Sequence, residues 1–330
     1  MKAAGAWAMV GRMSLSLAPG VRERLRSEIA KVVVGQGEAV DEVLAAFVAG
    51  GHVLLEGVPG VAKTLIAKAL ARSLDLSVSR VQFTPDLMPA DILGTSVFRP
   101  GTGTFELVRG PVFTDVLVAD EVNRSPPKTQ AALLEAMEER QVTLEGVRHP
   151  LGPFFFVVAT QNPVEYEGTW PLPEAQTDRF LVKVKVGYPS EAEESELLRR
   201  SGGDFAPDDI EAAGVRPVLG RGELQRLREV ARRLPVSPEV LAYVARLARA
   251  SRSLPRLRLG ASPRAGLALL AAARSLAAVR GAEWLSPDDV KAVAPAVLRH
   301  RLVLRPEAEL EGATADDVIG ELLASVEVPR

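Results

Sequence analysis

Short apolar runs alternate with helical patterns between residues 32 and 188, and this alternation predicts an α/β fold. Two of the runs, 115–119 and 154–159, are apolar almost without interruption. Strands that are covered on both faces, as in a parallel sheet, have this composition. Helices between successive strands supply the crossovers that parallel pairing needs. We therefore expect a five-stranded parallel sheet sandwiched by helices, with strands near residues 52–55, 80–83, 115–119, 154–159 and 180–186.

The pattern becomes helical throughout after residue 222, which predicts a smaller all-helical domain over 223–330. Ser-Pro pairs at 237–238, 262–263 and 286–287 mark helix starts, because serine caps a helix and proline suits its first position. The helices expected here cover residues 222–234, 238–253, 263–280, 287–299 and 315–325.

The rest of the chain divides around these two parts. We expect residues 1–20 to be a flexible N-terminal extension and 21–188 to be the α/β domain. Residues 189–222 are assigned as a linker: Ser190 and Glu193 form a capping box that opens a helix, and a glycine-rich stretch follows over 201–222. Two hairpin insertions are expected near 98–106 and 141–150.

Composition narrows the possible chemistry. The 330 residues include no cysteine, which excludes disulfides, thiolate metal sites and a cysteine nucleophile. The formal net charge of −2 argues against general nucleic-acid binding. No apolar run approaches the roughly 18 residues that span a bilayer, so no membrane insertion is expected, and the absence of cysteine fits a cytoplasmic protein.

A glycine-rich loop, residues 57–64, follows the first apolar run and precedes a helical pattern. Glycines let backbone N–H groups approach a phosphate, and the helix N-terminus adds partial positive charge. Lys63 would reach the β- and γ-phosphates and Thr64 would ligate Mg²⁺. Ala62 stands where such loops usually carry glycine. The set expected to bind the nucleotide comprises Gly57, Val58, Pro59, Gly60, Val61, Ala62, Lys63, Thr64 and Leu65.

Two carboxylates end the third expected strand. Asp120 at the strand tip can hold Mg²⁺, and Glu121, pointing elsewhere on an extended chain, can polarise an attacking water. A solvated acidic turn is the alternative. After the fourth strand, Asn162 is chosen over Thr160 as a hydrogen-bond donor to the γ-phosphate or its water, the alternative being a turn residue before proline.

Two arginines are candidates for stabilising the transferred phosphate. Arg179 precedes the fifth strand and could act as an arginine finger in a neighbouring subunit, with Arg124 and Arg140 as rivals and a surface ion pair with Asp178 as the alternative. Arg264 lies in the first turn of a helix, where a cation opposes the helix dipole. An anion such as the γ-phosphate would compensate, although simple solvent exposure explains the placement as well.

The order of these segments strongly resembles the MoxR-type AAA+ ATPases. The resemblance covers about residues 32–304 and rests on the strings 57–64, 119–130, 159–163, 172–180 and 260–264. It implies an AAA+ P-loop module followed by a helical lid, with ATP and Mg²⁺ bound between the subunits of a ring, usually a hexamer. Alanine at position 62 is common in that family.

The resemblance also implies residue roles. Lys63 and Thr64 match Walker A, and Asp120 and Glu121 match Walker B. Asn162 matches sensor 1, Arg179 the arginine finger and Arg264 sensor 2, acting either on its own subunit's nucleotide or on a neighbour's. Gln36 belongs to the segment 34–36 near the adenine.

The function implied is that of a chaperone-like remodeler in the assembly or metal-cofactor maturation of protein complexes, with a separate von Willebrand factor A domain protein as partner. A nucleic-acid motor or loader related to MCM-type proteins is the alternative, because the two hairpins are similar to hairpins that face DNA in that family. A nucleotide-gated scaffold that does not hydrolyse ATP is a third possibility.

Overall fold

A five-stranded parallel sheet forms the centre of the protein, and its strand order brings segments from distant parts of the sequence together. The computed structural model describes residues 20–329 apart from 102, 164–167 and 202–208; the predicted extension over 1–20 lies almost wholly outside this range. All neighbouring strands of the sheet are parallel. From edge to edge they are β2 (Val78–Gln82), β5 (Val116–Asp120), β8 (Phe156–Gln161), β1 (Val53–Glu56) and β9 (Val182–Lys185).

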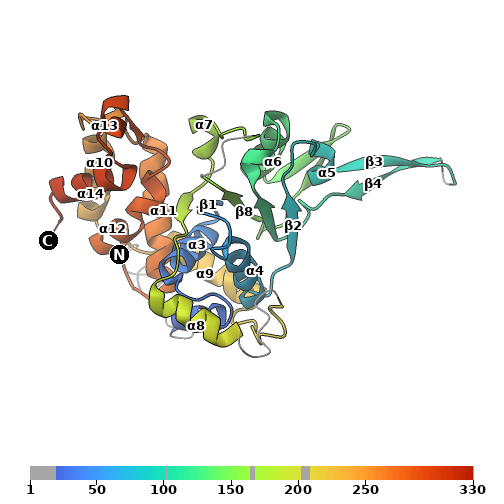
Figure 1. Ribbon diagram of the computed structural model, residues 1–330, viewed down its shortest axis with the longest axis horizontal. Helices are drawn as coiled ribbons and strands as arrows, with labels where there is room; N and C mark the ends of the chain where they lie inside the picture. Colours follow the sequence, from blue (N-terminus) through green and yellow to red (C-terminus); the bar gives the residue numbers. More distant parts are fainter. Residues whose placement is uncertain (1–19, 102, 164–167, 202–208, 330) are drawn as a thin grey trace, which may run out of the picture.

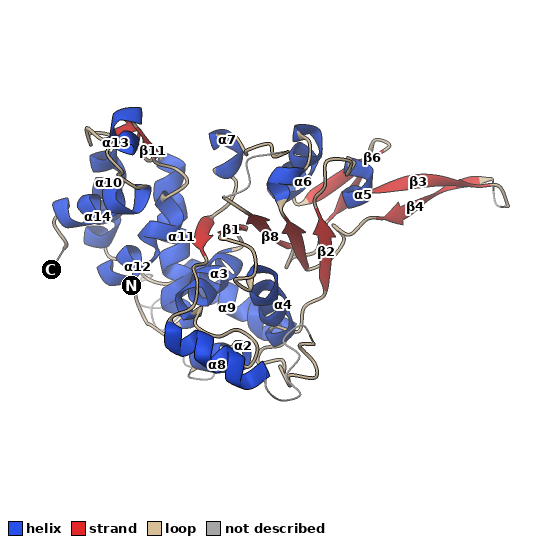
Figure 2. Cartoon of the chain, viewed as in Figure 1, coloured by secondary structure: helices blue, strands red, loops and turns tan. Residues whose placement is uncertain are grey.

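Helices cover the sheet (Figure 2), as the alternating pattern predicts. Along the buried strands, neighbouring side chains belong to two different cores: Val116 and Val118 pack in one, and Leu117 and Ala119 in the other. The inner strands of the sheet are therefore buried on both faces, whereas the edge strand β2 is largely exposed. The helices of this part are α2 (Val21–Ile29), α3 (Gly37–Ala49), α4 (Lys63–Ser73), α5 (Pro89–Leu93), the 3₁₀ helix η1 (Val122–Arg124), α6 (Pro127–Glu139), α7 (Glu174–Thr177) and α8 (Glu191–Ser201).

Two antiparallel hairpins interrupt the α/β pattern close to the predicted insertions. The first is longer than the expected 98–106 and projects far from the body of the molecule (Figure 1). The hairpin over 141–150 has the predicted limits. Their strands are β3 (Gly94–Arg99) with β4 (Thr104–Arg109), and β6 (Gln141–Leu144) with β7 (Val147–Pro150).

The C-terminal part is mainly helical, and three of its helices begin where the Ser-Pro pairs predict. The hydroxyls of Ser237, Ser262 and Ser286 each accept a backbone N–H in the first turn. One short antiparallel pair, β10 (Leu257–Leu259) with β11 (Val303–Leu304), adds strands to a region for which the sequence indicated helices alone. The helices are α9 (Arg221–Arg233), α10 (Pro238–Ser251), α11 (Pro263–Val279), α12 (Pro287–Leu298), α13 (Pro306–Leu310) and α14 (Ala315–Ser325).

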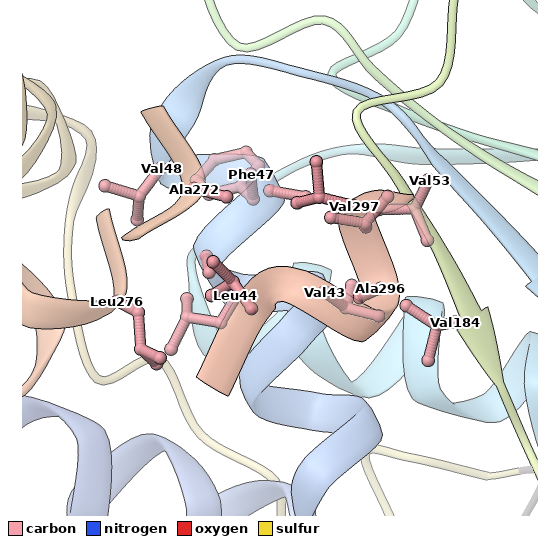
Figure 3. Close-up of a cluster of buried hydrophobic side chains, with 14 of the residues drawn as sticks. Val43, Leu44, Phe47, Val48, Val53, Val184, Ala272, Leu276, Ala296 and Val297 are labelled. Carbon is pink, nitrogen blue, oxygen red and sulfur yellow. The ribbon is translucent and has the colours of Figure 1, made fainter. Parts of the chain in front are cut away.

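Helix α3 joins the two parts through a shared hydrophobic core. Its side chains Val43, Leu44 and Phe47 lie between the sheet and helices α11 and α12 (Figure 3). Arg228 of α9 reinforces this contact, because its guanidinium donates to the carbonyls of Phe47 (2.8 Å) and Pro153 (2.7 Å). The helical part is thus packed against one face of the α/β part.

The segment between the two parts contains the helix that Ser190 predicts. The carboxylate of Glu193 accepts the backbone N–H of Ser190 at 2.8 Å, and α8 follows. Among the described residues, no helix is both long and apolar enough to cross a membrane.

His52, at the start of β1, is buried and fixed in one neutral tautomer. Its Nδ1 accepts the Val157 N–H at 3.0 Å, so its Nε2 carries the proton and donates to the Met137 carbonyl at 3.1 Å. Burial lowers the pKa of His52 from 6.5 to about 3, with nearby Arg140 adding to the effect. Because the pKa of His52 is lower in the folded than in the unfolded protein, protonation of His52 favours the unfolded state. The free energy of unfolding is therefore highest, as far as His52 is concerned, above about pH 6.5, and it decreases as the pH falls toward 3.

We predict that His52→Gln makes stability less sensitive to acid. Between pH 7 and pH 5 the free energy of urea unfolding should fall by about 2 kcal/mol less in the variant than in the wild type. The comparison uses the change with pH, so any constant loss of stability in the variant cancels. An identical pH dependence in both proteins would show that His52 titrates normally in the folded state.

Candidate nucleotide-binding site

The loop over residues 57–62 connects β1 to α4 and has the backbone geometry of an anion-binding turn. A Cβ on Gly57 would lie 2.3 Å from the Val186 carbonyl oxygen, so the end of β9 approaches too closely for any side chain there. Gly60 has φ 85° and Ala62 has φ 64°, both in the left-handed region. Left-handed and helical residues in succession form concave backbone surfaces that attract anions, and the N-terminus of α4 begins at once at Lys63.

A cavity of about 460 Å³ lies over this loop. It sits at the carboxyl ends of β1, β5 and β8, where ligands of open α/β sheets bind. The adjacent α8 and the segment between α2 and α3 close its apolar side through Leu197, Val32 and Val34. Its remaining lining residues are Gln36, Pro59, Gly60, Val61, Ala62, Lys63, Thr64, Leu65, Arg80, Gln82, Asp120, Glu121, Thr160, Asn162 and Pro189.

Asp120, the last residue of β5, accepts hydrogen bonds from three other elements. Its Oδ2 accepts from Thr64 Oγ1 at 2.9 Å and from Arg80 Nε at 2.8 Å, and its Oδ1 accepts from Thr160 Oγ1 at 2.7 Å. The carboxylate is buried, with the residue 6% exposed. These bonds join α4, β2, β5 and β8 at one point, at the carboxyl ends of the strands.

Glu121 lies just beyond the strand in a left-handed conformation with φ 56°. The direction of its side chain therefore comes from this turn and not from strand alternation. Its N–H donates to Thr160 Oγ1 at 2.8 Å, and its Oε2 accepts from Gln82 Nε2 at 2.8 Å. A non-glycine residue adopts this backbone region where surrounding contacts enforce it, often at functional sites.

Three more of the predicted site residues, Lys63, Gln36 and Asn162, line the same cavity, whereas Gly57 and Val58 do not. Lys63 Nζ donates to the carbonyls of Gly57 and Val58, the latter at 2.8 Å, so its ammonium rests inside the loop. Gln36 Nε2 donates to the Gly187 carbonyl at 3.0 Å, which ties the segment before α3 to the chain after β9. Asn162 is buried and lines the cavity.

Arg179 and Arg264 lie together in a separate cavity of about 360 Å³. His52 and Leu181, which immediately precede β1 and β9, also line this cavity. It therefore lies at the amino ends of the strands, opposite to the first cavity. Arg179 Nη1 pairs with Glu138 at 2.5 Å. Neither arginine therefore lies at the first cavity, over the loop at residues 57–62 of the same chain.

The sequence predicted either a bound anion or solvent beside Arg264, but the structure places two carboxylates there. The carboxylates of Glu138 (3.9 Å) and Asp178 (3.8 Å) lie beside its guanidinium and offset the unfavourable helix dipole. Of the rivals to Arg179, Arg140 lines the same second cavity and donates to the Phe155 carbonyl at 3.4 Å. Arg124 instead lies 3.4 Å from Glu121.

The donor set suits Mg²⁺ and a triphosphate. Thr64 and Asp120 offer hard oxygen ligands within 2.9 Å of each other, beside the turn whose backbone favours phosphate. Within the described part of the chain, no three His, Cys, Asp or Glu side chains cluster as metal ligands.

Two side chains of the cavity, Arg80 and Gln82, were not among the residues that the sequence predicted, and Thr160 was considered only as the alternative to Asn162. Thr160 bridges Asp120 to the Glu121 backbone, and Arg80 and Gln82 reach both carboxylates from β2. Residues 80 and 82 alternate with the buried Val81 and therefore share a face of the strand. Knowledge of the strand order, with β2 beside β5, would have pointed to them.

The comparisons with known proteins agree with this geometry. The sequence profile of the ATPase family associated with various cellular activities (AAA) matches residues 52–182, and that of the AAA lid domain matches 249–322. The chain is 45% identical over 317 residues to Chaperone MoxR1 of Mycobacterium tuberculosis, covering 93% of this chain and 82% of the relative.

Two further likenesses extend over almost the whole chain. Protein MoxR of Methylorubrum extorquens is 34% identical, with 93% of this chain and 94% of the relative covered. A solved structure of a candidate ATPase from Cytophaga hutchinsonii has a TM-score of 0.86 at 38% identity, covering 97% of this chain and 98% of that one.

We predict that Ala62→Gly stabilises the protein. Alanine at φ 64° is strained, so glycine should raise the free energy of unfolding by about 0.5–1 kcal/mol after its larger unfolded entropy is counted. Ala131→Gly, an exposed position inside α6, is the matched control and should lower it by about 0.5–1 kcal/mol. Equal losses in both variants would contradict the left-handed geometry at position 62.

Proposed function

The chain belongs to the MoxR-type AAA+ ATPases, and from this membership we propose that it is an Mg²⁺-dependent remodeler that works as a ring of six subunits in the cytoplasm. It hydrolyses ATP to ADP and phosphate. The observation that supports the proposed site most strongly is convergence. The phosphate loop, Asp120, Glu121 and Asn162 come from three separate strands and line one cavity.

The proposed chemistry divides between the two carboxylates. Asp120 and Thr64 hold Mg²⁺, which offsets phosphate charge when bound. Glu121 orients the attacking water and accepts its proton, and Asn162 positions that water against the γ-phosphate. Lys63 leaves the loop carbonyls to contact the β- and γ-phosphates. The segment at Val34 and Gln36 lies beside the adenine.

Arg179 and Arg264 are proposed to act in a neighbouring subunit. They lie at the edge of the sheet opposite their own cavity, separated from it by strand β1, whose four residues extend about 13 Å. Both lie beside Glu138, which holds the two guanidinium groups close together. Each site is then completed by the next subunit of the ring, and we propose that Arg264 acts there and not on the nucleotide of its own subunit.

The proposed work of the ring is protein remodelling. The relationship to a protein named as a chaperone supports this over other uses of ATP. In line with the family resemblance, we propose a separate von Willebrand factor A domain protein as partner, and assembly or metal-cofactor maturation of client complexes as the process served.

A nucleic-acid motor is not favoured. On the projecting hairpin β3–β4, Arg99 pairs with Glu106 at 2.7 Å, which offsets its positive charge. Arg109 of the same hairpin stacks over Phe113, with 5.2 Å from the guanidinium carbon to the ring centroid. Nucleic-acid binding needs a basic surface, and the chain as a whole is slightly acidic.

We predict that Lys63→Ala and Glu121→Gln separate binding from turnover. Lys63→Ala should abolish or severely weaken binding of a fluorescent ATP analogue. Glu121→Gln should bind it normally but lower kcat by about 10²–10⁴-fold, the usual contribution of a general base. Phosphate release and fluorescence titration measure the two effects. Turnover at the wild-type rate by Glu121→Gln would remove that residue from the proposed role.

We predict that the arginines act between subunits. Arg179→Ala and Arg264→Ala should each lower ATPase activity, Arg179→Ala by about 10³-fold or more. Mixing Arg179→Ala with Glu121→Gln subunits should restore activity, because the second supplies the arginine and the first an intact site. Arg99→Ala on the hairpin is the control and should leave basal turnover unchanged. Mixtures no more active than their separate components would contradict action between subunits.

A further inference from the structure

We propose that Arg80 is a positioning residue that competes with a divalent cation for Asp120, so that binding of the metal–nucleotide complex must displace its guanidinium. The inference rests on the proposed Mg²⁺ site at Thr64 and Asp120. It concerns a residue of β2 that lies outside the phosphate loop and outside the acidic pair.

The contact is placed where a metal ligand must be available. Arg80 Nε donates to Asp120 Oδ2 at 2.8 Å, and this same oxygen accepts the Thr64 hydroxyl at 2.9 Å. Asp120 Oδ1 is already used by Thr160 at 2.7 Å. Thr64 Oγ1 also lies 3.2 Å from Oδ1, but Oδ2 is the nearer oxygen. Oδ2 is therefore the oxygen that Thr64 and the Arg80 guanidinium share in this structure.

The burial of the two partners differs in a way that favours exchange. The Asp120 side chain is 8% exposed, whereas that of Arg80 is 49% exposed. A buried carboxylate needs a nearby positive charge, and removal of that charge is costly. Arg80 approaches from the open side, where it lines the cavity, and can leave into solvent without disturbing the core.

The strand geometry holds the arginine at this point. In the β2–β5 register Gln82 lies opposite Asp120 and Arg80 opposite Val118, so the long side chain of Arg80 reaches forward along β5 to its end. Its Nη2 also donates to Gln82 Oε1 at 3.0 Å, which fixes the guanidinium plane. Hydrogen bonds to Asp120 and to Gln82 thus set the position of the Arg80 guanidinium.

A metal between Thr64 and Asp120 would bring a second positive charge to the oxygen that Arg80 contacts. Two cations cannot share one buried oxygen at hydrogen-bond distance without strong repulsion. Arg80 would therefore stabilise Asp120 while no metal is bound and weaken the hold on the metal once it arrives. A residue of this kind favours release of the spent nucleotide with its ion.

The test is a titration of Mn²⁺ onto the full-length protein with saturating ADP, with free Mn²⁺ followed by electron paramagnetic resonance. Arg80→Gln and Arg80→Met should bind Mn²⁺ about tenfold more tightly than the wild type, a typical coupling between two sites. Arg80→Lys keeps the charge and should stay close to wild type. Arg256→Gln, which removes an ion pair with Glu321 in the helical part, is the control and should change nothing.

A second readout follows thermal stability. Without metal and nucleotide the neutral variants should melt at a lower temperature than the wild type, because Asp120 loses its counter-charge. Mn²⁺ with ADP should raise their melting temperature by more than it raises that of the wild type. Both shifts together distinguish an exchangeable counter-ion from an ordinary surface ion pair.

Two outcomes would overturn the inference, and they are distinguishable. Wild-type protein that binds Mn²⁺–ADP, with unchanged or weaker binding in the neutral variants, would show that Arg80 does not compete and would leave the proposed function in place. Wild-type protein that binds no Mn²⁺ with ADP would remove the metal site itself, and with it both this inference and the proposed Mg²⁺ dependence.

Discussion

The hydrogen bonds that converge on Asp120 are the interaction on which the site depends. One carboxylate joins the first turn of α4, the tip of β5, a threonine on β8 and an arginine on β2. This is possible because parallel strands end at one edge of the sheet, which brings together segments separated by up to about a hundred residues. The cluster fixes where the phosphate loop lies relative to Glu121, and so fixes the geometry of the cavity.

The two ends of the parallel strands carry complementary parts of the proposed active site. The phosphate loop, the two carboxylates and Asn162 lie at the carboxyl ends of the strands, whereas Arg179 and Arg264 lie at the amino ends. Helix α3 connects these ends to the helical part, since its apolar side chains pack against both β1 and α11 (Figure 3). Movement of the helical part, which carries Arg264, is therefore mechanically linked to the sheet that holds the nucleotide. In the proposed ring, this link would convert hydrolysis into motion.

Sequence reasoning predicted the strands and most helices well, for physical reasons visible in particular residues. The runs at β5 and β8 are apolar because both faces are buried, and the Ser-Pro pairs begin α10, α11 and α12 because serine caps and proline starts a helix. Contacts made through strand pairing were not predictable. Arg80 belongs to no motif, and Thr160 lies in one whose role was assigned to Asn162, so the part of both residues in the site follows from the β2–β5–β8 order. The left-handed backbone at Glu121 and the short β10–β11 pair likewise depend on tertiary contacts.

A crystal structure with Mg²⁺ and a slowly hydrolysed ATP analogue tests the central claim most directly. The account predicts the triphosphate along residues 57–64, the ion between Thr64 and Asp120, and arginines of a neighbouring subunit at the γ-phosphate. An analogue bound elsewhere, or a loop closed over its own side chains with the nucleotide excluded, would contradict it.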